Sequence, residues 1–175
     1  MTDLAVSITE DQIMANIGDF ISQFVSCEVV QVQFNRAPML PKSSEFVAFS
    51  KKSMKLLSKP YDTYTDTTKK VLGRLQYVVQ VDFYGEDSGA RASSISSLMS
   101  DMSGADFFKS SGYDMQTLYA SDAKQLPIIT GEEQYLARWT FDAVFQINQF
   151  FTLPVQTANT LSVNLVNVDA TFPAS

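Results

Sequence analysis

The sequence predicts an α+β fold: a single domain, mainly an antiparallel β-sheet with a long β-hairpin, and two principal helices packed on one face. Three observations support it. From Tyr135 to Ile147 the odd positions are apolar or aromatic and most even positions are polar, as in a strand with one buried face. Residues 9–25 repeat apolar side chains at helical spacing. Two alternating segments, 45–57 and 69–84, flank a stretch of turn-forming residues.

Length and composition are those of one folded domain. The chain has 175 residues, of which 45% are hydrophobic and 18% charged, so we expect a single domain over residues 1–175. No apolar run approaches the roughly 18 residues of a membrane span, and the start of the chain lacks a signal-like segment. We therefore expect a soluble product with no membrane contact. Cys27 is the only cysteine, which excludes an intramolecular disulfide.

The first helix carries its own start signal. Thr9 is followed three residues later by Gln12, the spacing of a capping box. Gly18 inside the helix indicates a close packing contact. Residues 28–34 then alternate as a short strand, and 35–44 contain two prolines, which predicts a loop.

The segments 45–57 and 69–84 predict a long hairpin, with residues 59–68 as its turn and a basic cluster at its tip. Such a ribbon has two interpretations. It is either a solvated edge that lysines protect from aggregation, or an arm over residues 45–84 that reaches a neighbouring subunit.

The second half contains fewer strong signals. Asp87 or Ser88 caps a predicted helix at residues 90–102, which Gly104 ends. The remaining expected elements are a strand fragment at 113–119, a connector at 121–130, the central strand at 135–147, a loop at 152–160 and a closing strand at 161–172.

Charge is segregated along the chain. Residues 36–74 contain nine basic and three acidic side chains, a net +6, which leaves −12 for the remainder of a chain whose total is −6. A basic segment on an acidic body can bind nucleic acid or the acidic face of another copy. The acidic total favours the second.

No catalytic set is recognisable, and we expect no enzyme activity, cofactor or metal. The chain has no histidine, and its seven glycines form no phosphate-binding loop. The pairs Glu86-Asp87 and Glu132-Glu133 are typical of caps and solvated turns. Arg138 and Asp142 lie four residues apart on the polar face, so we expect them to pair with neighbouring strands or across a subunit boundary.

Four stretches carry a resemblance to a known family. They are NRAPMLP at 35–41, VDFYG at 81–85, LYASDAKQLPIITGEEQYLARWTF at 118–141 and NVDATFP at 167–173. In this order the chain resembles the neck and tail-terminator (tail completion) proteins of tailed bacteriophages. The resemblance covers most of the chain, from the first helix to the last strand.

The resemblance implies a structural virion protein that forms a hexameric ring in the neck and is assembled in the host cytoplasm. The ring ends the tail tube and joins the tail to the head connector, and DNA passes through its lumen without specific binding. The implied partners are other copies, the tail tube protein and the sheath on one face, and a head-connector or neck protein on the other.

The candidate sites are therefore interface residues. They are Arg36, Met39, Leu40, Lys51, Lys52, Lys55, Lys124, Glu132 and Glu133. Within the structural class, the alternatives are a head-tail joining protein and a tail tube protein. Outside it, the alternatives are a nucleic-acid-binding module that uses the basic hairpin and a carboxylate-dependent hydrolase that uses Glu132 and Glu133.

Overall fold

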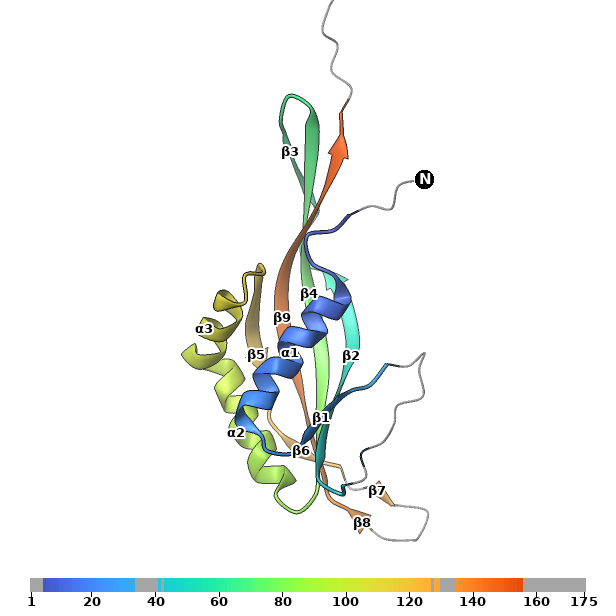
Figure 1. The fold of residues 1–175 in the computed structure, drawn as a ribbon, viewed down its shortest axis with the longest axis vertical. Coiled ribbons are helices and arrows are strands. Elements are labelled where there is room, and N and C mark those ends of the chain that lie inside the picture. Colours follow the sequence, from blue (N-terminus) through green and yellow to red (C-terminus); the bar gives the residue numbers. More distant parts are fainter. Residues whose placement is uncertain (1–4, 34–40, 42, 127, 130–134, 156–175) are drawn as a thin grey trace, which may run out of the picture.

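A computed structural model describes residues 5–33, 41, 43–126, 128–129 and 135–155. It contains a seven-stranded sheet whose main path runs β1-β2-β4-β9-β5, with β3 paired to β4 and β6 to β9 (Figure 1). The strands are β1 (Glu28–Gln31), β2 (Phe46–Leu56), β3 (Tyr61–Tyr64), β4 (Thr68–Tyr84), β5 (Met115–Ala120), β6 (Lys124–Gln125) and β9 (Arg138–Pro154). A separate two-stranded sheet pairs β7 (Ile128–Ile129) with β8 (Tyr135–Leu136).

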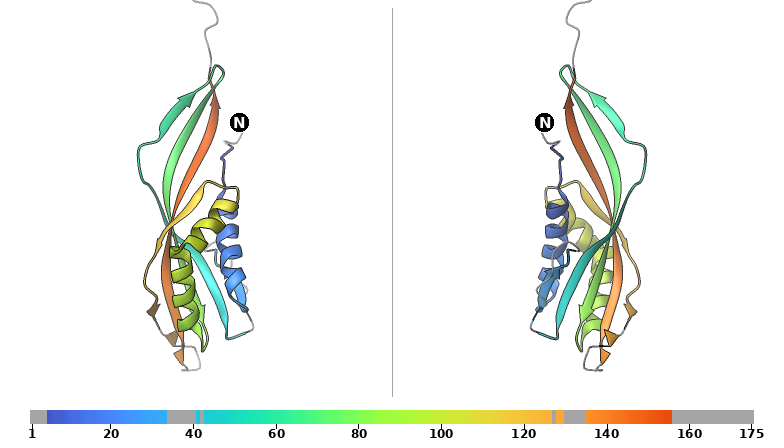
Figure 2. Two further views of the ribbon diagram at one scale, coloured as in Figure 1. Left: turned by 90° about the vertical axis from the view of Figure 1, so that its left-hand side faces the viewer. Right: turned by 90° about the vertical axis from the view of Figure 1, so that its right-hand side faces the viewer.

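The helices α1 (Glu10–Phe24), α2 (Ser88–Ser100) and α3 (Met102–Ser110) lie on one face of the sheet (Figure 2). The predicted α+β class, with a mainly antiparallel sheet, is thereby confirmed. Two differences from the prediction are a third helix and a parallel pairing between β1 and β2.

The centre of the sheet is a long ladder between β4 and β9. These antiparallel strands pair without interruption from Thr68 opposite Pro154 to Tyr84 opposite Arg138. Because side chains alternate along a strand, the odd positions of both strands point to the helices and the even positions to the other face. The odd positions supply most of the buried apolar residues of the sheet, and the helices cover them: Tyr77, Val79, Val81, Phe83, Phe141, Ala143, Phe145 and Ile147.

Helix α1 begins where the sequence predicts. The Thr9 hydroxyl accepts a hydrogen bond from the Gln12 backbone N–H, and the Gln12 side chain accepts one from the Thr9 N–H, so the capping box is complete. Gly18 is the predicted close contact: a Cβ there would lie 3.0 Å from the ring of Phe49. The glycine therefore lets α1 approach β2 closely.

The structure corrects the predicted end of the second helix. Helix α2 ends at Ser100, and Gly104, which we expected to end it, lies inside α3. A Cβ at Gly104 would lie 2.7 Å from the Met99 carbonyl oxygen. The glycine thus permits the tight junction between the two helices, and Phe108 of α3 is fully buried in the core.

The hairpin also differs in detail. The predicted turn at 59–68 contains a strand, β3, and the chain reverses only at residues 65–67, where the hydroxyls of Thr65 and Thr68 are 2.6 Å apart. Lys51 and Lys52 lie well before this turn, whereas Lys69 and Lys70 follow it directly. Only part of the basic cluster is therefore at the tip. A bulge between Lys51 and Ser53 shifts the register of β2 against β4.

The second half requires further corrections. Residues 152–154 continue β9 instead of forming a loop, because they pair with the start of β4. The predicted central strand is divided at Ala137 between β8 and β9. The closing strand at 161–172 and most of the loop at 35–44 lie outside the described residues. In the part of the chain that is described, no helix is long and apolar enough to span a membrane.

Candidate functional site

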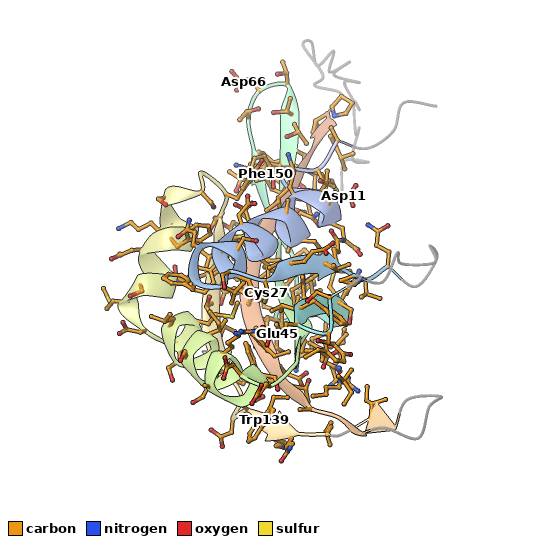
Figure 3. All side chains as sticks on the ribbon, turned by 60° about the horizontal axis from the view of Figure 1, so that its bottom comes forward. Asp11, Cys27, Glu45, Asp66, Trp139 and Phe150 are labelled. Carbon is orange, nitrogen blue, oxygen red and sulfur yellow. The ribbon has the colours of Figure 1, made fainter. Side chains whose placement is uncertain are left out.

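One end of the sheet extends beyond the helices as a ribbon, which we call the arm (Figure 1). It consists of residues 55–74, which include β3, and residues 149–154 at the end of β9. Every residue from 55 to 67 is exposed. Figure 3 places Asp66 at the tip of the arm and Phe150 nearer to its base. A strand with both faces in water is unusual for an isolated globular domain.

The arm also exposes apolar and aromatic side chains. Four of the large exposed hydrophobic residues are on it: Leu56, Leu57, Tyr61 and Tyr64, with exposures between 42% and 61%. Tyr61 lies opposite Leu72 and Tyr64 opposite Lys69, so the two tyrosines are on opposite faces of the ribbon. Concentrations of exposed apolar side chains mark protein contact surfaces.

The charges of the arm differ between its two faces. On the face that continues the helix-covered side of the sheet, Lys69 forms an ion pair with Asp62 at 2.7 Å and lies over the Tyr64 ring. The hydrogen bond to Asp62 raises the pKa of Lys69. On the other face, the Lys70 Nζ lies 3.5 Å from the centre of the Phe150 ring. Lys55, Lys59, Lys70 and Arg74 have no ion pair with any other residue that the structure describes.

The three lysines predicted as one interface cluster are separated by the bulge in β2. Lys51 forms an ion pair with Glu10 in the first turn of α1, on the helix side. Lys52 forms one with Asp142 of β9 at 2.6 Å, on the opposite side. Only Lys55 lacks an ion pair with another described residue. Lys51 and Lys52 therefore tie β2 to the rest of the domain.

Lys124, the fourth predicted lysine, lines the same surface hollow as Lys52, although the two residues are far apart in the sequence. Strand β6 places Lys124 opposite Thr140 of β9. Lys52, Lys124, Arg138 and Asp142 line a shallow hollow of about 280 Å³ on the helix-free face. The other predicted site residues, Arg36, Met39, Leu40, Glu132 and Glu133, lie outside the described part of the chain.

A largely buried ion pair lies on the same helix-free face of the sheet. Arg138 of β9 binds Asp82 of β4, and Asp82 is only 8% exposed. The sequence predicted that Arg138 and Asp142 pair with neighbouring strands or across a subunit boundary. Arg138 pairs with the neighbouring strand β4, whereas Asp142 pairs with Lys52 of β2, one strand further along the sheet. The sequence did not identify Asp82 as a partner, because the register between β4 and β9 is set by tertiary pairing.

Sequence reasoning also missed a groove between α1 and α2. It has a volume of about 370 Å³ and is lined by Phe24, Val25, Asp87, Ala90, Arg91, Ser94, Ile95 and Leu98. Phe24 is 46% exposed although it is aromatic. One sequence feature could have indicated the groove. Phe24 continues the apolar stripe of α1 beyond Ile21, the last buried residue of the helix.

The surfaces formed by the described residues contain no recognisable chemical centre. In the described ranges, no three His, Cys, Asp or Glu residues are grouped so as to hold a metal ion. The distinctive features are an uncovered arm, an apolar groove and a polar sheet face. They define an α+β domain with surfaces suited to contact other proteins.

Residues 11–171 match the family described as phage neck terminator protein. The chain belongs to this family, which confirms the resemblance predicted from the sequence. It is a structural protein of the bacteriophage neck, located in the neck and tail region of the virion, where it contacts other head and tail proteins. No curated protein matches the chain.

Proposed function

We propose that this protein forms a hexameric ring that ends the tail tube, stops its growth and offers a surface to the head connector. DNA passes through the lumen without specific binding. The family supports a role in the neck. The ring, its stoichiometry and its order among the neck components are our inference.

The observation that carries the proposal is the arm. All residues from 55 to 67 are exposed, including the whole of β3, and both faces carry large apolar side chains. A single copy leaves this surface in water, whereas an adjacent copy in a ring can cover it. The arm projects at one end of the sheet only (Figure 1). Such an arrangement fits a head-to-tail contact, which closes into a ring when the rotation permits.

Charge supports the same arrangement. The region 36–74 has a net charge of +6 and the remainder of the chain −12. Contact between unlike ends of identical subunits would bring these opposite charges together. A net acidic protein also repels DNA, as a channel wall without binding sites requires.

The test is the mass and shape of the purified protein. We expect light scattering to show a species near six subunits whose population falls with salt, and electron microscopy to show rings without long polymers. Added to growing tail tubes, the protein should stop elongation. Long polymers of the protein alone would instead identify a tube subunit, and a strict monomer with and without tubes would contradict the ring.

The paired lysines provide a matched control. Lys55→Gln with Lys59→Gln removes two arm charges that have no ion pair with other described residues, and it should weaken assembly. Lys51→Gln with Lys52→Gln removes the same charge from two lysines already paired within the subunit. It should alter assembly less. An equal loss in both variants would contradict a specific role for the arm.

The alternatives receive less support. A nucleic-acid-binding hairpin would use Lys51, Lys52 and Lys55 together, but the bulge places Lys51 and Lys52 on opposite faces with carboxylate partners. A head-tail joining ring would use the same kind of subunit contact, and the tube-elongation experiment separates it from a terminator.

A further inference from the structure

One face of the arm combines apolar and basic side chains. Leu57 lies opposite Arg74, Tyr61 opposite Leu72, and Leu72 opposite Phe150. These residues are on the face that continues the helix-free side of the sheet, together with Lys70. We call this surface the arm patch: Leu57, Tyr61, Lys70, Leu72, Arg74 and Phe150.

Among the described residues of the arm, no acidic side chain lies on the arm patch to neutralise its charge. The two acidic residues of the arm are elsewhere, since Asp62 pairs with Lys69 on the opposite face and Asp66 is in the turn. Leu57 is 42% exposed and Tyr61 51% exposed. Lys70 lies over Phe150 and Arg74 is exposed. The surface that fits this patch is therefore apolar at its centre and acidic around it.

The groove between α1 and α2 meets both requirements. Phe24, Ile95 and Leu98 give it an apolar lining, and Asp87 adds a carboxylate. Arg91 is the only basic residue among those lining it, and Glu45 and Asp87 compensate its charge at 2.8 and 3.6 Å. A groove of about 370 Å³ has room for an aromatic side chain from another surface.

The surroundings of the groove are acidic over a wider area. Residues 10–24 and 86–110, which include the three helices, contain seven acidic and two basic side chains, a net −5. Residues 55–74 of the arm contain five basic and two acidic side chains, a net +3. Opposite potentials of this kind orient two surfaces as they meet.

The two surfaces lie far apart on one subunit. The groove is formed where α1 ends and α2 begins, at the end of the helical layer remote from the arm (Figures 1 and 2). The arm points away from it. An arm can therefore fill only the groove of another copy.

We propose that the arm patch of one subunit docks in the α1–α2 groove of the next, with Tyr61 inserted between Phe24 and Leu98. This inference rests on the proposed ring, because it names the two surfaces that form the subunit contact. It assigns the partner as a second copy of this chain and the contact as head-to-tail.

Single-site variants test each side of the contact. Tyr61→Ser removes the inserted ring, and Ser94→Arg fills the groove from an exposed helix position. Each should raise the protein concentration needed for assembly by roughly tenfold or more. The controls are Tyr64→Ser on the opposite face of the arm and Ser93→Arg, which is exposed on α2 but does not line the groove. Both should assemble like the wild type.

Mixing the two defective proteins gives a sharper result. The Ser94→Arg protein keeps an intact arm and the Tyr61→Ser protein an intact groove, so one sound contact forms between them. At a protein concentration at which the wild type assembles and each variant alone is monomeric, the mixture should contain dimers by light scattering. Monomers in the mixture, or controls as defective as the test variants, would overturn the contact.

A cross-link separates failure of this contact from failure of the ring. In a Cys27→Ser background, proteins carrying only Thr63→Cys, which is exposed beside Tyr61 on the same face of the arm, or only Ser94→Cys are mixed and mildly oxidised. Disulfide-linked dimers containing one of each should predominate, even where the assembly is weak. Rings of wild-type protein without this cross-link would overturn the docking and leave the ring intact. The cross-link without wild-type rings would keep the docking and reject the ring.

Discussion

Arg138 of β9 and Asp82 of β4 form an ion pair across the two central strands. The Arg138 Nε and Nη2 atoms lie 3.1 and 2.9 Å from the same carboxylate oxygen of Asp82. Gln80 donates from its side-chain nitrogen to both oxygens of that carboxylate, at 3.1 and 3.0 Å. The side chains are 21% and 12% exposed, so the two charges compensate each other in a largely buried setting.

Removing only the arginine should therefore destabilise the domain. Arg138→Met leaves the Asp82 carboxylate buried with Gln80 alone, and we expect a loss of about 2–3 kcal/mol in the free energy of unfolding. Urea denaturation measures it. The control is Arg74→Met on the exposed arm, which should change stability by less than about 0.5 kcal/mol. The double variant Asp82→Leu with Arg138→Met removes the buried carboxylate as well and should recover part of the lost stability. Equal stabilities for the single variants Arg138→Met and Arg74→Met would contradict this account.

The sequence predicted those elements whose signals are local. Helix α1 and the strands β2 and β4 begin and end within a residue or so of prediction, because a capping box and period-two alternation operate within one segment. Strand β3 was missed. Pro60, Asp62 and Thr65 are ordinary turn residues, and only pairing with β4 makes residues 61–64 a strand. In the same way, Pro154 suggested a loop but forms the last residue of β9, where a missing N–H is tolerated.

The candidate site was also predictable only where its signal lies within one segment of the sequence. The basic region that contains the arm was predictable, because the charges along the sequence can be counted without knowing the fold. That count could not show that Lys51 and Lys52 are paired within the subunit, because their partners Glu10 and Asp142 are brought near by the sheet and by α1. The groove between α1 and α2 depends on how two distant helices pack. Its lining is visible only in three dimensions.

The capping box makes a simple prediction about α1. Thr9→Ala removes the hydroxyl that accepts from the Gln12 N–H, leaving a backbone donor without its partner in the first turn. We expect a loss of about 1 kcal/mol in the free energy of unfolding, measured by urea denaturation. Thr9→Ser keeps the hydroxyl and should stay close to the wild type. A loss in the serine variant as large as in the alanine variant would show that capping is not the cause.

Two glycines with positive φ should respond differently to the same substitution. Gly85 has φ of 106°, and a Cβ there would lie 2.6 Å from the Cγ atom of Glu45. Gly112 has φ of 80°, with no atom within 4 Å of such a Cβ. Both variants carry the backbone cost of an L-residue, roughly 1–2 kcal/mol. Only Gly85→Ala adds a steric conflict beside the Glu45–Arg91 ion pair.

Thermal and urea denaturation of both alanine variants measure the difference. Gly85→Ala should be less stable than Gly112→Ala by about 1 kcal/mol or more, because an overpacked contact adds to the backbone strain. A Gly112→Ala protein that is as unstable as Gly85→Ala would assign the whole effect to the backbone and none to Glu45.

The burial of Tyr77 should make the stability of the domain depend on pH in the alkaline range. Its side chain is 1% exposed, and its hydroxyl has no hydrogen-bond partner among the described residues. Burial, with the negative charges of Glu10 and Asp11, raises the pKa of Tyr77 well above its usual value near 10. The folded protein therefore holds this proton when the unfolded chain has released it. The contribution of the neutral Tyr77 side chain to the free energy of unfolding is fully present below pH 10 and is lost as the pH rises further.

Tyr77→Phe isolates this contribution, because phenylalanine fills the same space without an ionisable group. At pH 8 the variant should be as stable as the wild type or slightly more so, since it removes a buried hydroxyl without a partner. Between pH 9 and 11 the wild type should lose up to about 1.4 kcal/mol more than the variant, measured by urea denaturation across that range. Tyr64→Phe, on the exposed arm, is the control and should follow the wild type. Parallel pH profiles for the wild type and Tyr77→Phe would show that Tyr77 ionises equally in the folded and unfolded states.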